Sequence, residues 1–139
     1  MKDRKNFVLT ALEVPTTPNF LIHETTTHIA SPIHLKIETV QKASDFKPSI
    51  ALLDKSKLKF PLSVRKWKKG DYFYPIGLRG KKKLSKFFKD EKYSLFEKEN
   101  TWILYSGEEI VWVVGKRLDE RYKITKETTS ILKITHPNS

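Results

Sequence analysis

The sequence predicts an α+β domain, made mostly of antiparallel strands with a sandwich-like core and one or two short helices. Two observations carry this prediction. Short apolar runs separated by turn residues recur along the chain, and the run at 33–39 alternates between apolar and polar side chains. Only residues 83–92 have the apolar spacing of a helix. A chain of 139 residues with 38% hydrophobic side chains has enough material for one domain with its own core.

The first half of the chain predicts four strands. Two prolines separate the first strand from the second. The third places Ile33, Leu35 and Ile37 on one face, as in a half-buried antiparallel strand. After the fourth, a turn or a single helical turn is expected over 54–58. The four runs are 6–12, 20–24, 33–39 and 50–53.

The second half predicts five more extended runs. Residues 67–71 form a tight turn after the first run, and Pro75 keeps the second out of a central ladder because proline lacks an N–H donor. Gly107 joins the third and fourth runs in a hairpin. Because both are almost continuously apolar, we expect both of their faces to be covered. The five runs are 61–65, 72–75, 101–106, 108–115 and 130–134.

Positive charge is concentrated in one stretch. The formal net charge is +11, and residues 65–92 contain eleven Lys or Arg against Asp71, Asp90 and Glu91, which gives this stretch +8. Such a concentration favours a polyanionic partner: nucleic acid, an anionic membrane surface or an acidic protein. The alternative is a basic face that only keeps the protein in solution.

The helix expected at 83–92 has two different sides. Leu84, Phe87 and Phe88 fall on one side, which would anchor the helix to the body of the domain. The other side would display a row of ammonium groups. That row is Lys82, Lys86 and Lys89.

Three of the five glycines, Gly70, Gly77 and Gly80, lie within the basic stretch. Because glycine permits positive φ and close backbone approach, we expect a folded loop whose N–H groups could meet a phosphate ahead of the helix. The alternative is that these glycines only make turns.

Catalytic motifs are missing from the sequence. The chain has no cysteine, and its four histidines lack the spacing of metal ligands. The adjacent carboxylates at 90–91 and 119–120 are expected to pair with neighbouring cations, and "GLRGK" does not fit a Walker loop. No apolar run approaches the roughly 20 residues of a spanning helix. We therefore expect a non-catalytic, cytoplasmic domain without a metal or a cofactor of its own.

An ordered string of motifs resembles the C-terminal domain of bacterial tRNA(Ile)-lysidine synthetase, a PP-loop family ligase. The string consists of "LSVRKWKKGDYFYPIGLRGKKKLSKFF", "DEK", "IVWVVGKRLDERYKIT" and "TTSILKI". The resemblance covers about residues 50–134, with a weaker similarity at 2–4. The matching positions are Arg65, Gly70, Asp71, Pro75, Gly77, Gly80, Lys82, Lys83, Leu84, Ser85, Phe87, Phe88, Trp112, Val113, Gly115, Arg117 and Thr128.

This resemblance implies what the domain does. The family's enzyme uses ATP and magnesium to ligate lysine to the wobble cytidine of a tRNA(Ile) with a CAU anticodon, which changes decoding from AUG to AUA. Its catalytic N-terminal PP-loop domain carries a Ser-Gly-Gly-x-Asp-Ser signature, which is absent here, so residues 1–139 would be a single C-terminal domain of a larger enzyme. The family's C-terminal domain grips the tRNA at its acceptor end. Its fold resembles part of the phenylalanyl-tRNA synthetase β subunit.

We expect seven cations to contact tRNA phosphates, which orient an RNA and carry little sequence information. For Arg65 and Arg117 a structural role, pairing with Asp71 or Asp119, is the alternative. The seven are Arg65, Arg79, Lys81, Lys82, Lys83, Lys86 and Arg117.

Two positions depart from the family pattern. Trp67 stands where a second arginine is frequent, and its ring could stack on a base or pack against the domain, with packing favoured. Lys86 stands where an aspartate is frequent, which makes the helix more cationic.

A second hypothesis is a protein-interaction module or homodimer that uses the apolar strand "IVWVV" (110–114) as a sheet edge. It predicts a concentration-dependent dimer. An independent enzyme is disfavoured because the catalytic motifs are missing.

Overall fold

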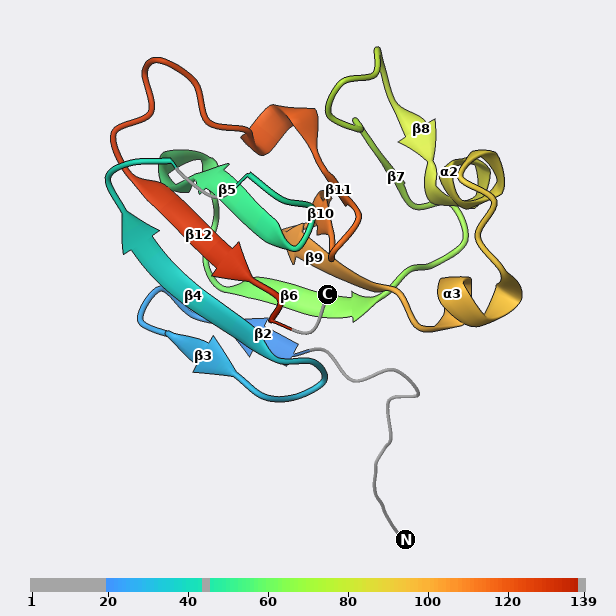
Figure 1. Cartoon of the computed structure of the whole chain (residues 1–139), viewed down its shortest axis with the longest axis horizontal. Coiled ribbons are helices and arrows are strands. Elements are labelled where there is room, and N and C mark those ends of the chain that lie inside the picture. Colours follow the sequence, from blue (N-terminus) through green and yellow to red (C-terminus); the bar gives the residue numbers. More distant parts are fainter. Residues whose placement is uncertain (1–19, 44–45, 138–139) are drawn as a thin grey trace, which may run out of the picture.

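A computed structural model describes residues 20–43 and 46–137 of the chain, which form two antiparallel sheets with a smaller third layer (Figure 1). The run expected at 6–12 and the weak family similarity at 2–4 lie outside the described residues. Within the described ranges, no helix is both long enough and apolar enough to cross a membrane.

The first sheet has five strands, and all of their pairings are antiparallel. In spatial order they are β11 (Arg117–Leu118), β10 (Glu109–Val113), β9 (Trp102–Ser106), β6 (Leu62–Lys66) and β2 (Phe20–Ile22). The second sheet has four strands: β3 (His28–Ile29), β4 (Leu35–Val40), β12 (Ile131–Thr135) and β5 (Ile50–Asp54). The predicted strands after residue 19 are therefore present.

Short elements connect and cover these sheets. A two-stranded ribbon pairs β7 (Tyr72–Phe73) with β8 (Lys82–Lys83), and β8 leads directly into helix α2 (Leu84–Asp90). The other helices of residues 20–43 and 46–137 are α3 (Leu95–Glu99) and the single 3₁₀ turns η2 (Lys55–Lys57) and η3 (Glu120–Tyr122). The 3₁₀ turn η2 confirms the helical turn expected at 54–58.

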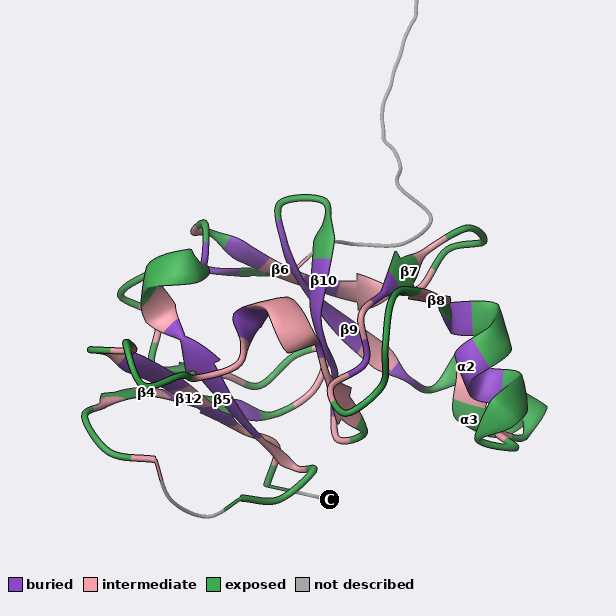
Figure 2. Cartoon of the chain, turned by 90° about the horizontal axis from the view of Figure 1, so that it is seen from above, coloured by how far each residue is buried: buried purple, intermediate pink, exposed green. Residues whose placement is uncertain are grey.

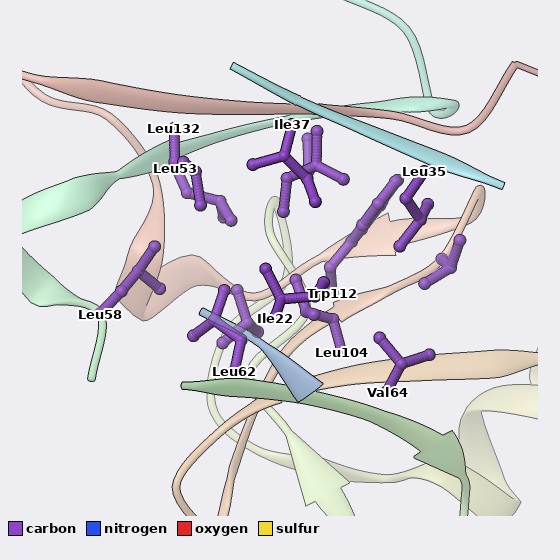
Figure 3. Packing of buried hydrophobic residues seen from close by; sticks show 14 of the residues in the cluster. Ile22, Leu35, Ile37, Leu53, Leu58, Leu62, Val64, Leu104, Trp112 and Leu132 are labelled. Carbon is purple, nitrogen blue, oxygen red and sulfur yellow. The ribbon is translucent and has the colours of Figure 1, made fainter. Parts of the chain in front are cut away.

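The main core lies between the two large sheets (Figure 3). Strand β4 contributes Leu35 and Ile37, while Lys36 between them is exposed, as the alternating sequence predicted. Leu104 and Trp112 face them from the five-stranded sheet. The sandwich-like core is therefore confirmed.

Strands β9 and β10 are covered on both faces, as their continuous apolar runs predicted. Along β9, Leu104 belongs to the core between the sheets, while Ile103 and Tyr105 belong to a second buried cluster on the opposite face. In β10 an irregularity of register lies between Ile110 and Trp112, so that Val111 and Trp112 both belong to the main core.

The third layer consists of β7, β8 and α2, and it covers the second face of the five-stranded sheet (Figure 2). Leu84, Phe87 and Phe88 are fully or almost fully buried there, and Phe73 packs edge-on against Phe87 with ring centroids 5.2 Å apart. The apolar stripe predicted for this helix is therefore confirmed.

The third layer is one continuous insertion between two neighbouring strands. Lys66 at the end of β6 pairs directly with Trp102 at the start of β9, so residues 67–101 leave the sheet and return to it at adjacent positions. Lys66 also holds the two ends of the insertion together at what we call its neck, the Lys66–Trp102 pair. Its ammonium lies 4.7 Å from the Trp102 ring centroid and donates to the Glu99 carbonyl.

Two expectations need correction. Lys82 does not project from the helix: it lies in β8. Strand β10 is not a sheet edge, since it lies between β9 and β11, so the proposed use of 110–114 as an exposed edge is wrong. Helix α3 has no buried residue, because Leu95 and Phe96 point to solvent, and apolar spacing therefore did not reveal it. Its signal was the capping box between Ser94 and Glu97.

Candidate functional site

The β7–β8 loop and the start of α2 enclose a pocket of about 450 Å³, which we call the basic pocket. Five of its eight lining residues are cationic, and no acidic side chain of the described residues lines it. The lining residues are Pro75, Leu78, Arg79, Gly80, Lys81, Lys82, Lys83 and Lys86. The fold therefore brings together five of the seven predicted contacts, while Arg65 and Arg117 lie outside the basic pocket.

The cations of the basic pocket differ in how they are paired. Arg79 and Lys83 are exposed and have no acidic partner among the described residues, and the Lys81 ammonium lies 4.8 Å from the centroid of the Tyr72 ring. Lys82 and Lys86 share one carboxylate, with Nζ atoms 2.6 Å and 3.6 Å from Asp90 oxygens. The hydrogen bond from Lys82 lowers the pKa of Asp90, so this carboxylate stays ionised at neutral pH.

A buried carboxylate fixes the base of the β7–β8 loop. Asp119 is fully buried and accepts hydrogen bonds from the Tyr74 backbone N–H at 2.9 Å and from the Arg121 guanidinium at 3.0 Å. The Arg117 guanidinium donates to the Ile76 carbonyl at 3.4 Å. These hydrogen bonds hold the backbone at Tyr74 and Ile76, where the β7–β8 loop begins, in a fixed position.

Within the loop the chain turns at two glycines. Gly77 and Gly80 have φ of +85° and +73°, in the region that side chains with a Cβ rarely adopt. The expected folded loop is therefore present, and its shape depends on these two positions.

Arg65 has the structural pairing that was the alternative for it. Its guanidinium lies 3.6 Å from the Asp71 carboxylate and 3.7 Å from the Tyr105 ring centroid, and its side chain is only 11% exposed. The Tyr105 hydroxyl donates to the same carboxylate at 2.6 Å, and burial together with this bond raises the pKa of Tyr105. Asp71 also accepts from the Lys68 N–H, which closes the turn at 67–71.

For Arg117 the expected partner is wrong. Asp119 is paired with Arg121 instead, and the Arg117 guanidinium lies over the Phe87 ring at 5.7 Å. Sequence analysis missed Arg121, although its place two residues after Asp119 was a local signal for pairing. The expectation that the acids at 90–91 and 119–120 pair with neighbouring cations is confirmed for Asp90, Asp119 and Glu120, whereas Glu91 makes no ion pair with a described residue.

The positions that depart from the family pattern are also resolved. Trp67 packs edge-on against Phe88 with ring centroids 5.2 Å apart, so packing is confirmed. Lys86 is 68% exposed on the outer side of α2.

The histidines and acids form no metal-binding cluster in the part of the chain that the structure describes: no three of them lie close enough to hold an ion. His28 and His34 have ring centroids 6.0 Å apart, without a third ligand.

Comparison with known proteins matches residues 62–134, more than half of the chain, to the family model described as TilS substrate C-terminal domain. The chain belongs to this family. The resemblance found in the sequence is therefore confirmed.

Curated relatives of this TilS C-terminal domain are much longer than the chain. The tRNA(Ile)-lysidine synthase of Parabacteroides distasonis is 43% identical over 136 residues, which are 95% of this chain and 31% of the relative. The enzyme of the same name from Bacteroides thetaiotaomicron is 35% identical over 106 residues, 70% of this chain and 25% of the relative. The chain thus spans less than a third of either relative.

A solved structure supports the fold. The crystal structure of a TILS C-terminal domain superposes with a TM-score of 0.68 at 18% identity, covering 89% of this chain and all of that one. The α+β, mostly antiparallel fold is therefore confirmed as that of the TilS C-terminal domain. The likeness to the phenylalanyl-tRNA synthetase β subunit stays a prediction.

Proposed function

We propose that this domain binds tRNA through the basic pocket and positions it, at its acceptor end, for the catalytic domain of a tRNA(Ile)-lysidine synthase. The observation that carries the proposal is the convergence of five cations from the β7–β8 loop, β8 and α2, without an acidic lining residue among those described. Phosphate groups are the part of an RNA that such a cluster binds, because each contact releases counterions from the polyanion.

The contacts differ in kind. Arg79, Lys81 and Lys83 are exposed and carry no ion pair among the described residues. Arg79 and Lys83 can therefore meet phosphates without losing an acidic partner, whereas Lys81 would leave its position over the Tyr72 ring. Lys82 and Lys86 exchange part of their interaction with Asp90 for a phosphate. Arg65 and Arg117 have an indirect role and do not contact the RNA. Arg65 stabilises the 67–71 turn through Asp71, and Arg117 stabilises the loop through the Ile76 carbonyl.

The rest of the proposed activity belongs to the longer protein. Relatives named tRNA(Ile)-lysidine synthase support a whole enzyme that joins lysine to the wobble cytidine of a tRNA(Ile) with a CAU anticodon and thereby changes decoding from AUG to AUA. ATP and magnesium would act in its N-terminal PP-loop domain, in the cytoplasm. This chain would contribute no catalytic residue and would cooperate with that domain.

The test compares tRNA binding by the 139-residue chain across a salt series with binding by an Arg79/Lys81/Lys83→Ala variant. We expect weaker binding and a salt dependence reduced by up to about three phosphate contacts, each worth roughly 0.9 in the slope of log K against log salt. Lys82 is left unchanged because its removal would leave Asp90 without its closest partner.

The matched control is Lys57/Lys59/Lys126→Ala, which removes the same charge from exposed positions outside the basic pocket. Equal losses in both variants would mean that net charge alone binds tRNA. Absence of binding in the unmodified chain, together with a dimer in light scattering, would replace the proposal by the interaction-module hypothesis.

A further inference from the structure

A second pocket opens at the side of the sandwich where the two large sheets end. Strand β5 is the last strand of the four-stranded sheet and β11 is the last strand of the five-stranded sheet (Figure 1). The pocket between them has a volume of about 340 Å³, within the range of small-ligand sites. We call it the apolar pocket, because its inner lining includes Ile50, Leu52, Ile76, Trp112, Leu118 and Ile124.

The rim of the apolar pocket is cationic. Four cations line it, and no acidic lining residue occurs among the residues that the structure describes. Lys47 and Lys116 are exposed and make no ion pair with any described residue, whereas Lys123 is paired with Glu120. The fourth cation is Arg117. An occupant that complements this pocket has a flat or apolar body and at least one negative group.

An aromatic side chain stands at the same pocket. Phe46 lines it although 73% of this residue is exposed to solvent. An exposed phenylalanine next to lysines is the usual arrangement for stacking a base of a single-stranded nucleic acid, since every base has a π-face and every nucleotide a phosphate.

We propose that the apolar pocket binds one unpaired nucleotide, with its base between Phe46 and the aliphatic lining and its 5′-phosphate near Lys47 and Lys116. The ligand chemistry is that of a nucleoside 5′-phosphate. In placing this nucleotide within an RNA held by the basic pocket, the inference rests on the proposed function.

The two pockets adjoin along the chain, because consecutive residues line them. Ile76 lines the apolar pocket and is bonded through its N–H to the Leu118 carbonyl at 2.9 Å. Pro75, the preceding residue, lines the basic pocket. We therefore place the unpaired nucleotide next to the part of the RNA that contacts the loop cations.

The first experiment uses mononucleotides and needs no variant. The methyl resonances of Ile76, Leu118 and Ile124 are followed by NMR in the 139-residue chain while AMP is added, and ribose 5-phosphate serves as the ligand without a base. We expect AMP to shift these methyl signals in a saturable manner and ribose 5-phosphate to leave them unchanged. Absence of saturable shifts with AMP, or equal shifts with both compounds, would overturn the inference.

The second experiment separates a nucleotide within RNA from a free one. Binding of a duplex with a short unpaired 3′ extension is compared with that of a blunt duplex carrying the same number of phosphates. We expect Phe46→Ala to reduce affinity for the extended RNA at least about fivefold, the low end of a lost base–aromatic stack, and to leave the blunt duplex unaffected. Phe96→Ala is the control, because Phe96 is also 73% exposed and is not among the residues that line the apolar pocket.

The outcomes keep the two proposals apart. If the RNA duplexes fail to bind while AMP still shifts the methyl signals, the proposed function fails and the pocket remains a site for free nucleotides. If the extended and blunt duplexes bind equally and Phe46→Ala changes neither, the pocket does not hold a nucleotide of RNA. A dimer whose formation Phe46→Ala abolishes would assign the pocket to a second copy of the chain and overturn the inference.

Discussion

The Nζ atom of Lys82 lies 2.6 Å from Oδ2 of Asp90, so that β8 is tied to the last turn of α2 beside the basic pocket. The same carboxylate also holds Lys86. Asp90 therefore neutralises part of the charge that the proposed function requires.

Replacing Asp90 with asparagine should tighten tRNA binding. The Asp90→Asn substitution frees two ammonium groups, and we expect roughly two- to fivefold higher affinity at low salt, on the scale of a partly exposed ion pair. Salt-series titration of tRNA measures this. Glu91→Gln makes the same change of charge at the neighbouring exposed residue, which has no ion pair among the described residues. An equal gain in both variants would show that the position of the charge is irrelevant.

Substitution of Arg65 should lower stability, whereas substitution of Arg79 should weaken tRNA binding. Arg65→Lys keeps the charge but loses the planar guanidinium on the Tyr105 ring, and we expect a loss of about 1–2 kcal/mol in the free energy of unfolding. Arg79→Ala should leave stability unchanged and reduce the salt slope by about one contact. Urea unfolding and tRNA titration of both variants test this pair. A salt slope reduced by about one contact in a folded Arg65→Ala variant would instead make Arg65 a phosphate contact.

The left-handed backbone at Gly80 should limit what can replace it. A Cβ there meets no atom within 4 Å, so any cost of Gly80→Ala comes from its φ of +73°, and we expect about 1–2 kcal/mol together with weaker tRNA binding. Gly80→Asn should recover part of both, because asparagine tolerates this conformation better. Gly107→Ala, also at positive φ and in open space, is the control: it should lower stability and leave tRNA binding by the folded protein unchanged.

The hydrogen bond from Thr128 to Asp54 should make stability depend on pH. Burial raises the pKa of Asp54, but hydrogen bonds from Ser56 and Thr128 outweigh it, so this pKa lies below its ordinary value. A carboxyl of this kind stabilises the fold above its unfolded pKa, and the contribution is lost as the pH falls through the folded pKa. Thr128→Val should therefore cost about 1 kcal/mol at neutral pH.

The difference between wild type and Thr128→Val should shrink as the solution becomes acidic, because a protonated Asp54 no longer gains from the charged hydrogen bond. Chemical unfolding at a series of pH values measures it. Thr129→Val, at an exposed neighbouring position, should show no such dependence. A difference that stays constant with pH would mean that Thr128 contributes through packing and through the hydrogen bond that its hydroxyl accepts from the Thr125 N–H, not through Asp54.

Local patterns predicted most of the fold. The alternation in β4, the continuous apolar runs of β9 and β10 and the apolar stripe of α2 each follow from which faces are buried, and burial leaves a period in the sequence. Helix α3 leaves no such period because its large apolar side chains are exposed.

The candidate site was predictable in composition and not in its internal pairing. The five cations of the basic pocket are close in sequence, so their convergence needed only a turn and a helix. Asp71 and Tyr105 are 34 positions apart, and Lys82 and Asp90 belong to different elements. The Asp71–Tyr105 pairing is set by how the third layer docks on the sheet, and the Lys82–Asp90 pairing by how β8 meets α2 within that layer. No local pattern encodes either contact.

The neck formed by Lys66 and Trp102 has a consequence for how this domain can diverge. Because the paired positions Lys66 and Trp102 flank residues 67–101, the insertion is an exchangeable cassette whose removal breaks no strand ladder of the sandwich. Its hydrogen bonds to Asp119 and Leu118 have to be provided again by the replacement. Its underside must be exchanged with it, since Phe87 and Phe88 are matched to Ile103 and Tyr105 beneath them. Under the proposed function, transplanting the cassette between homologues should carry the RNA contacts of the basic pocket from one scaffold to another, provided that the contact layer is carried along.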